Sequence, residues 1–116
     1  MNLILYDKNR LDQNGLAEFL QSNPAINVMT ATSRHEVLKY FNSGANIEKV
    51  IFWNMSLPSD LGLIKYIKEN FAETKIMVFA SPIIKQSIEI IKGTEIEVMN
   101  NTFEELKKIN YMTANN

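Results

Sequence analysis

The chain has 116 residues, of which 46% are hydrophobic and 22% charged, and these values are typical of one globular domain and not of a disordered segment. Twelve basic and thirteen acidic residues give a formal net charge of -1, so no overall positive field favours nucleic acid or anionic lipid. The absence of cysteine and the single histidine exclude a disulfide framework, a thiolate metal site and a multi-histidine zinc site.

Short apolar runs alternate along the chain with longer segments of helical spacing. In chain order, the runs rich in β-branched and aromatic residues predict five strands, at 3–6, 26–30, 50–53, 76–79 and 96–99. The first, third and fourth runs are nearly continuously apolar, which is typical of strands buried on both faces of a parallel sheet. The runs 26–30 and 96–99 are mixed and fit the two edges of the sheet.

A helix is predicted after each of these strands. The first helix ends at Asn23 and Pro24. The second begins after Ser33, which stands three residues before Glu36 in capping-box spacing, and it ends at Gly44.

The three later helices have start signals of their own. Ser59 or Asp60 can cap the third helix, Pro82 fits the first turn of the fourth, and Thr102 can cap the fifth. The order is (βα)5, and right-handed crossovers then predict a doubly wound α/β domain with strand order 2-1-3-4-5. This is a flavodoxin-like three-layer sandwich. We expect the domain to span residues 1–112, followed by a polar tail or the start of a linker at 113–116.

A site on such a sheet lies beyond the carboxyl ends of the strands, at the switch between the first and third strands. The residues that follow the strand ends are mostly polar. They are Asp7, Lys8, Asn9 and Arg10; Asn54, Met55 and Ser56; Ala80 and Ser81; and Asn100 and Asn101. Because Asp7 is the one carboxylate in this set, we predict no metal site. We also predict no cofactor.

Three stretches match motifs of a known family. Leu11, Gly15 and Leu16 keep the register of V-D-D-H-P-L-x-R-x-G-L, and residues 54–58 read N-M-S-L-P where the family has D-x-x-M-P. Residues 101–106, N-T-F-E-E-L, are similar to the family's late lysine motif. Over its whole length the chain resembles the receiver domains of bacterial two-component response regulators, closest to the NarL/LuxR type. The resemblance implies a CheY-like fold.

The resemblance also implies which positions form the active site. A receiver is phosphorylated on one of its own aspartates, which holds magnesium together with two further acids. A Ser/Thr hydroxyl and a lysine contact the phosphoryl group. Here Asp7 matches the first acid, but Lys8 replaces the second acid and Asn54 replaces the phosphate acceptor. An amide has no anionic oxygen with which to attack phosphorus. We therefore predict a pseudo-receiver that is not an enzyme.

The remaining family positions are replaced as well. The hydroxyl position holds Ala80 and the lysine position Asn101, while a shift of one residue would place Ser81 or Asn100 there. The aromatic switch position of the fifth strand holds Val98. A rotamer switch driven by phosphorylation is therefore not expected.

Two interpretations stay open for each polar residue that differs from the family. Lys8 either places its ammonium at the metal position and pairs with Asp7, or it is a solvated loop lysine. Asn54 either binds another ligand or forms a hydrogen bond with a neighbouring loop.

The predicted fourth helix carries more isoleucine than one buried stripe requires. The set is Ile83, Ile84, Ile88, Ile90 and Ile91. An exposed apolar patch marks a partner surface, and the resemblance implies a dimer or output surface on helix 4, strand 5 and helix 5. The alternative is a helix covered by a neighbouring domain or by the C-terminal tail.

We therefore predict a signalling module of an atypical response regulator that acts through a protein partner or as a homodimer. The subfamily implies transcription regulation through a DNA-binding domain outside this chain. No segment has the length of a signal peptide or membrane span, so we expect a cytoplasmic protein without membrane contact.

Three alternatives remain. One is a stand-alone signalling adaptor. Another is a small-ligand module on the flavodoxin-like fold, although residues 7–10 contain no glycine or hydroxyl for a phosphate loop. The third is a working receiver that uses Asp60, which we expect to lie away from the strand end because it comes after Pro58.

Overall fold

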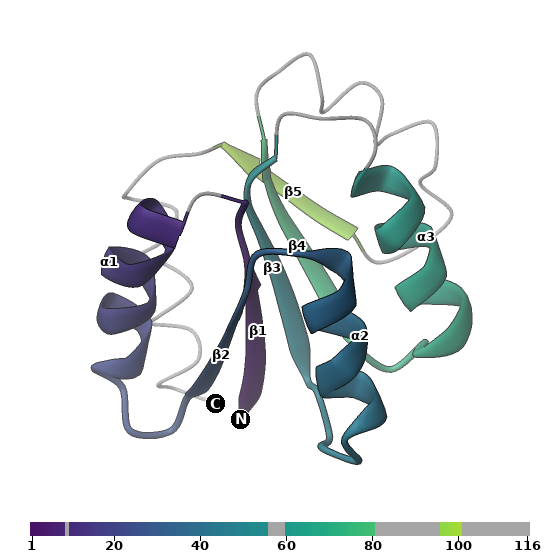
Figure 1. Ribbon diagram of the computed structural model, residues 1–116, viewed down its shortest axis with the longest axis horizontal. Helices are drawn as coiled ribbons and strands as arrows, with labels where there is room; N and C mark the ends of the chain where they lie inside the picture. The colour runs from purple at the N-terminus through teal and green to yellow at the C-terminus, as the bar shows by residue number, and fades with distance from the viewer. Residues whose placement is uncertain (9, 56–59, 81–95, 101–116) are drawn as a thin grey trace.

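Five parallel strands form one sheet in the computed structural model, which describes residues 1–8, 10–55, 60–80 and 96–100 (Figure 1). The strands are β1 (Asn2–Tyr6), β2 (Asn27–Ala31), β3 (Lys49–Met55), β4 (Lys75–Ala80) and β5 (Ile96–Asn100). Their order in the sheet is β2-β1-β3-β4-β5, and every neighbouring pair is parallel. The predicted doubly wound order and the two predicted edge strands are confirmed.

Helices cover both faces of this sheet, as Figure 1 shows. The helix α1 (Arg10–Gln21) packs on one face, and α2 (Arg34–Asn42) and α3 (Asp60–Asn70) pack on the other. The predicted three-layer, CheY-like sandwich is therefore confirmed. The fourth and fifth predicted helices, with the isoleucine set and the tail at 113–116, lie outside the described residues. In the part of the chain that is described, no helix combines the length and the apolar character needed to cross a membrane.

The interior strand β1, which lies between β2 and β3, explains why the first apolar run has no polar residue. Its side chains point alternately to the two faces, so Ile4 and Tyr6 join the core under α2 and α3, while Leu3 and Leu5 join the core under α1. All four side chains are buried. A strand that is covered on both faces requires apolar residues at every position.

Both ends of α2 have the predicted chemistry. The Ser33 Oγ accepts the Glu36 N–H at 3.2 Å, and the Glu36 carboxylate accepts the Thr32 hydroxyl at 2.7 Å. Past the last turn, Gly44 has a φ of 86°, a left-handed conformation that glycine adopts without strain. These local signals fix where α2 begins and ends.

Four of the observed strands are longer than predicted, whereas β2 has the predicted length and is shifted by one residue along the chain. The largest extension is at β3, which continues past Trp53 to Met55, with an irregular register between Phe52 and Met55. The reason is that backbone hydrogen bonds define a strand, and polar residues such as Asn54 form these bonds as well as apolar ones do.

Candidate functional site

The register of the sheet brings the predicted site positions to one edge. Tyr6 at the end of β1 pairs with Phe52 of β3, and Met55 at the end of β3 pairs with Ala80 of β4. Ala80 in turn pairs with Asn100, the last residue of β5. The strand ends that carry the predicted positions therefore form a single carboxyl edge.

Asp7 lies directly beyond β1 at this edge. Its backbone N–H donates to the Ala31 carbonyl at 3.1 Å, which extends the pairing of β1 and β2 by one step. Asp7 is buried, with 3% of its surface exposed. The position that matches the family's first acid is therefore fixed by the backbone and shielded from solvent.

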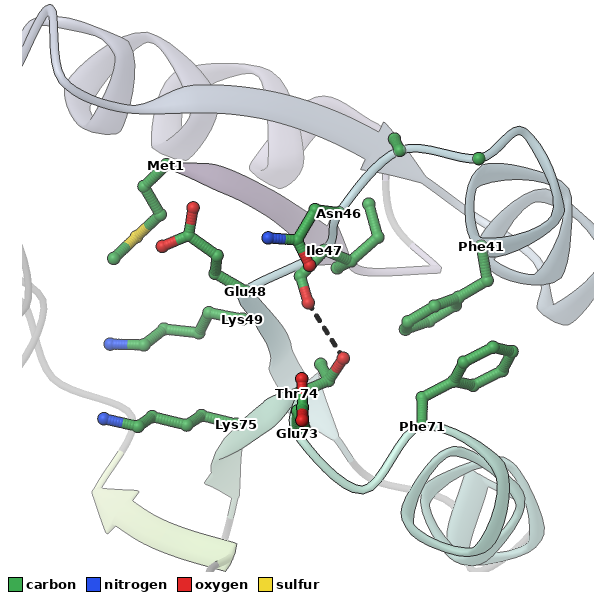
Figure 2. Close-up of a pocket in the computed structure, with 12 residues that line it drawn as sticks. Met1, Phe41, Asn46, Ile47, Glu48, Lys49, Phe71, Glu73, Thr74 and Lys75 are labelled. Carbon is green, nitrogen blue, oxygen red and sulfur yellow. Dashed lines mark hydrogen bonds between the residues drawn. The ribbon is translucent and has the colours of Figure 1, made fainter.

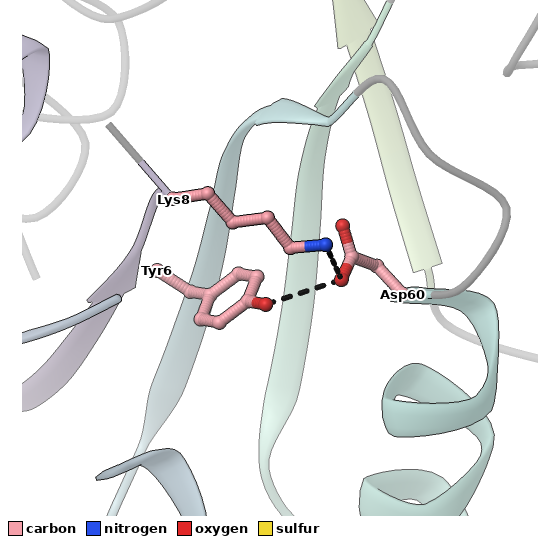
Figure 3. A network of polar contacts seen from close by, with 3 residues as sticks. All are labelled: Tyr6, Lys8 and Asp60. Atoms are coloured by element: carbon pink, nitrogen blue, oxygen red, sulfur yellow. Dashed lines mark hydrogen bonds and ion pairs between the residues drawn. The ribbon is translucent and has the colours of Figure 1, made fainter. Parts of the chain in front are cut away.

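Figure 3 shows a polar network at the same edge that joins three elements. The Lys8 ammonium, from the loop after β1, lies 3.3 Å from Oδ1 of Asp60 at the start of α3. The Tyr6 hydroxyl, from the end of β1, donates to the same Oδ1 at 3.1 Å. We call Tyr6, Lys8 and Asp60 the edge network.

Burial distinguishes the members of the edge network. The Asp60 side chain is 10% exposed, whereas the Lys8 side chain is 46% exposed and keeps contact with water. Tyr6 is 4% exposed, and its ring centroid lies 5.3 Å from that of Phe52. A nearly buried carboxylate is therefore neutralised by a lysine that reaches in from the surface.

The electrostatics of the network keep Tyr6 protonated. Burial raises the pKa of Tyr6 above its ordinary value, and the negative charge of Asp60, the hydrogen bond to Asp60 and the charge of Asp7 raise this pKa further. A tyrosine with the ordinary pKa of 10.0 is already neutral at physiological pH, and the raised pKa extends this neutral form to more alkaline pH. The phenol can act as a permanent donor to the Asp60 carboxylate.

One expectation from the sequence is wrong. Asp60 does not lie away from the site, because α3 begins at this residue and its carboxylate contacts both Tyr6 and Lys8. For Lys8, the observed ion pair favours a counter-ion over a purely solvated lysine, and it is formed with Asp60, where the sequence had suggested Asp7. The acidic first turn of α3 was visible in the sequence, but its contact with β1 was not.

The other predicted site residues fall into two groups. The backbone places Asn54 near the end of β3, Ala80 at the end of β4, and Val98 opposite Val78 within β5. Ser81, Asn101 and the predicted partner-surface residues Ile83, Ile84, Ile88 and Ile91 lie outside the described residues.

The described side chains at the carboxyl edge do not fit the magnesium ion that receivers hold. Among the described residues, no group of three or more His, Cys, Asp or Glu side chains is arranged to hold a metal ion. The charge that faces Asp60 is the ammonium of Lys8, and a protonated lysine has no lone pair to donate to a metal.

A separate pocket of about 760 Å³ lies at the opposite, amino-terminal end of the sheet (Figure 2). Its wall includes Phe41 and Phe71, whose rings stack with centroids 4.2 Å apart. The Thr74 hydroxyl donates to the Ile47 carbonyl at 2.8 Å within the same wall. The pocket is remote from the edge network, and the rule for carboxyl ends gave no reason to expect it.

Comparisons with solved structures identify the fold. A response regulator from Thermotoga maritima is similar at a TM-score of 0.76 and 18% identity, with 99% of this chain and 98% of that chain covered. The response regulator TrrA from Thermotoga maritima, solved in complex with Mg²⁺ and BeF, gives a TM-score of 0.74 at 24% identity, with 97% of each chain covered.

One similar structure bears the name of an enzyme. It is described as the adenylate cyclase from Rhodopirellula baltica and gives a TM-score of 0.80 at 13% identity, covering 98% of this chain and 87% of that chain. No protein-family model and no curated protein matches the sequence. The structural likenesses therefore establish that this chain has the fold of a response regulator receiver domain.

Proposed function

We propose that the chain is a pseudo-receiver, a signalling domain of an atypical response regulator that works through protein contacts without aspartyl phosphorylation. The observation that carries this proposal is the edge network, in which Lys8 and Tyr6 both contact Asp60 at the edge where receivers carry out phosphoryl transfer. A cation that belongs to the chain itself neutralises this carboxylate. The Asp60 carboxylate therefore needs no metal ion for charge balance.

The chemistry of the edge supports the absence of phosphoryl transfer. Transfer to an aspartate requires a carboxylate nucleophile and positive charge that neutralises the phosphoryl oxygens. β3 carries Asn54 at the acceptor position, and an amide nitrogen or oxygen cannot form an acyl phosphate. Lys8 stands in the position of the second magnesium ligand and brings the opposite charge.

Asp60 is the alternative acceptor, and its environment disfavours this role. Its side chain is 10% exposed, and its Oδ1 already accepts from Tyr6 and contacts Lys8. An oxygen engaged in this way is a poor nucleophile, and a nearly buried carboxylate is hard for a phosphodonor to approach.

The output of the domain is proposed to be a protein contact in the cytoplasm. Among the residues whose side chains the structure describes, Tyr66 is the one large hydrophobic residue that is exposed, at 38%. The described surface therefore offers little apolar area to a partner. We place the contact on the isoleucine set of the predicted fourth helix, either between two copies of this chain or with another protein. Transcription regulation would then require a DNA-binding domain outside this chain.

A magnesium titration of four variants tests the proposal. The wild type, Asn54→Asp, Lys8→Asp and the double variant are titrated with magnesium, and the fluorescence of Trp53 is followed because Trp53 precedes Asn54 in β3. We expect binding by the double variant alone, because the Lys8 ammonium still competes with the ion in Asn54→Asp. Magnesium binding by the wild type would contradict the proposal.

A further inference from the structure

We propose that Lys8 is a counter-ion, supplied by the chain itself, whose ion pair with Asp60 holds the start of α3 against the end of β1. We call this ion pair the latch. It keeps the carboxyl edge in one arrangement without any bound ligand. This inference deepens the proposed function and rests on it, because it explains how a receiver fold without phosphorylation keeps a defined surface.

The connection between α3 and β1 is made by side chains. Asp60 is the first residue of α3, and it is linked to Tyr6 of β1 at 3.1 Å and to Lys8 of the following loop at 3.3 Å. The network ties together segments that are more than fifty positions apart in the chain. The first turn of α3 is therefore held from outside its own helix.

Two features make Lys8 the removable part of this latch. The Tyr6 hydroxyl is enclosed in the core, whereas the Lys8 side chain is 46% exposed. If the charge of Lys8 is lost, Asp60 keeps its nearly buried negative charge but retains only the Tyr6 hydroxyl from this network. A buried carboxylate that loses its counter-ion gains stability by reaching water, which favours opening of the first turn of α3.

The chain supplies a matched control on the same helix. Lys65 and Glu69 form an i,i+4 pair at 4.0 Å, and their side chains are 67% and 62% exposed. Exposed pairs of this kind have little effect on stability because water screens them. Glu69→Gln therefore removes one ion pair from α3 without touching the latch.

Amide hydrogen exchange of the full chain tests the latch. In an α-helix, the N–H groups of Ile64 and Lys65 bond to the carbonyls of residues 60 and 61, so they report opening of the first turn. We expect Lys8→Met to speed exchange at these two amides about tenfold, with a change of less than about twofold at Val50 and Ile51 of β3. Lys8→Arg, which keeps the charge, should restore protection to within about threefold of the wild type.

The outcomes separate the latch from the proposed function. Exchange in Lys8→Met within twofold of the wild type, or an effect equal to that of Glu69→Gln, would overturn the latch. Uniform acceleration at α3 and β3 would overturn it as well, because the change would then be global. The wild type would still be a pseudo-receiver if it took no phosphoryl group, and a phosphorylated wild type would overturn the proposed function whatever the exchange rates.

Discussion

Replacing Tyr6 by phenylalanine isolates the hydrogen bond that links the core of the sheet to α3. The ring of Tyr6 is buried against Phe52, and phenylalanine keeps this packing while it removes the hydroxyl that donates to Asp60 at 3.1 Å. A hydrogen bond to a charged group contributes about 1.5–3 kcal/mol to stability. For a domain of this size that loss corresponds to a melting temperature lower by about 6–12 °C.

The chain contains a matched control for this change. The Tyr40 hydroxyl donates at 2.8 Å to a neutral acceptor, the Thr30 carbonyl, in a partly buried position. Because bonds to neutral acceptors contribute only about 0.5–1.5 kcal/mol, Tyr40→Phe should cost less than Tyr6→Phe.

Urea denaturation at pH 7 measures both changes, and a double-mutant cycle with Asp60→Ala assigns the effect to its partner. We expect a coupling energy between Tyr6 and Asp60 of at least about 1 kcal/mol. A Tyr6→Phe variant within about 0.5 kcal/mol of the wild type, or a coupling energy near zero, would show that the hydrogen bond does not hold α3.

Three further predictions concern pH and the ends of the helices. The pKa of Tyr6 is raised in the folded state, so the unfolded chain loses this proton first, above the ordinary pKa of 10.0. The contribution of Tyr6 to stability is therefore full below about pH 10 and then falls by about 1.4 kcal/mol per pH unit. In alkaline denaturation experiments, Tyr6→Phe should remove this part of the pH dependence. Ser33→Ala should cost about 1 kcal/mol in urea denaturation because the Glu36 N–H loses its cap. Gly44→Ala should destabilise the domain by about 1–2 kcal/mol in urea denaturation because φ is 86°. Gly62→Ala, at an exposed position in the first turn of α3, should instead stabilise it by up to about 1 kcal/mol, and equal effects would refute the conformational argument.

Local patterns in the sequence predicted most of the described fold. The unbroken apolar run at Leu3 to Tyr6 indicated a strand covered on both faces, and β1 is the strand that lies between β2 and β3. Ser33 with Glu36 and Gly44 marked the ends of α2. Each of these signals is contained within a few neighbouring residues, which is why a single sequence is enough to detect it.

The site was predictable only in part, because its contacts join distant segments. The carboxyl-edge rule placed Asp7, Lys8 and Asn54 at the correct end of the sheet. The edge network was missed because Tyr6 and Asp60 are 54 positions apart. The pattern of apolar residues in a sequence predicts that a side chain is buried, but it does not predict which distant side chain it contacts. The one local signal of this contact was Tyr6, which ends the otherwise aliphatic run 3–6. A buried tyrosine hydroxyl requires a hydrogen-bond acceptor, so a partner for Tyr6 could be expected.

The most direct test of the central claim is intact-mass spectrometry of the chain after incubation with acetyl phosphate and magnesium. We expect the mass to stay unchanged, because Asn54 has no nucleophilic oxygen and Asp60 is engaged by Tyr6 and Lys8. A hydroxylamine-labile gain of about 80 Da, which is the mass of one phosphoryl group bound as an acyl phosphate, would contradict the account.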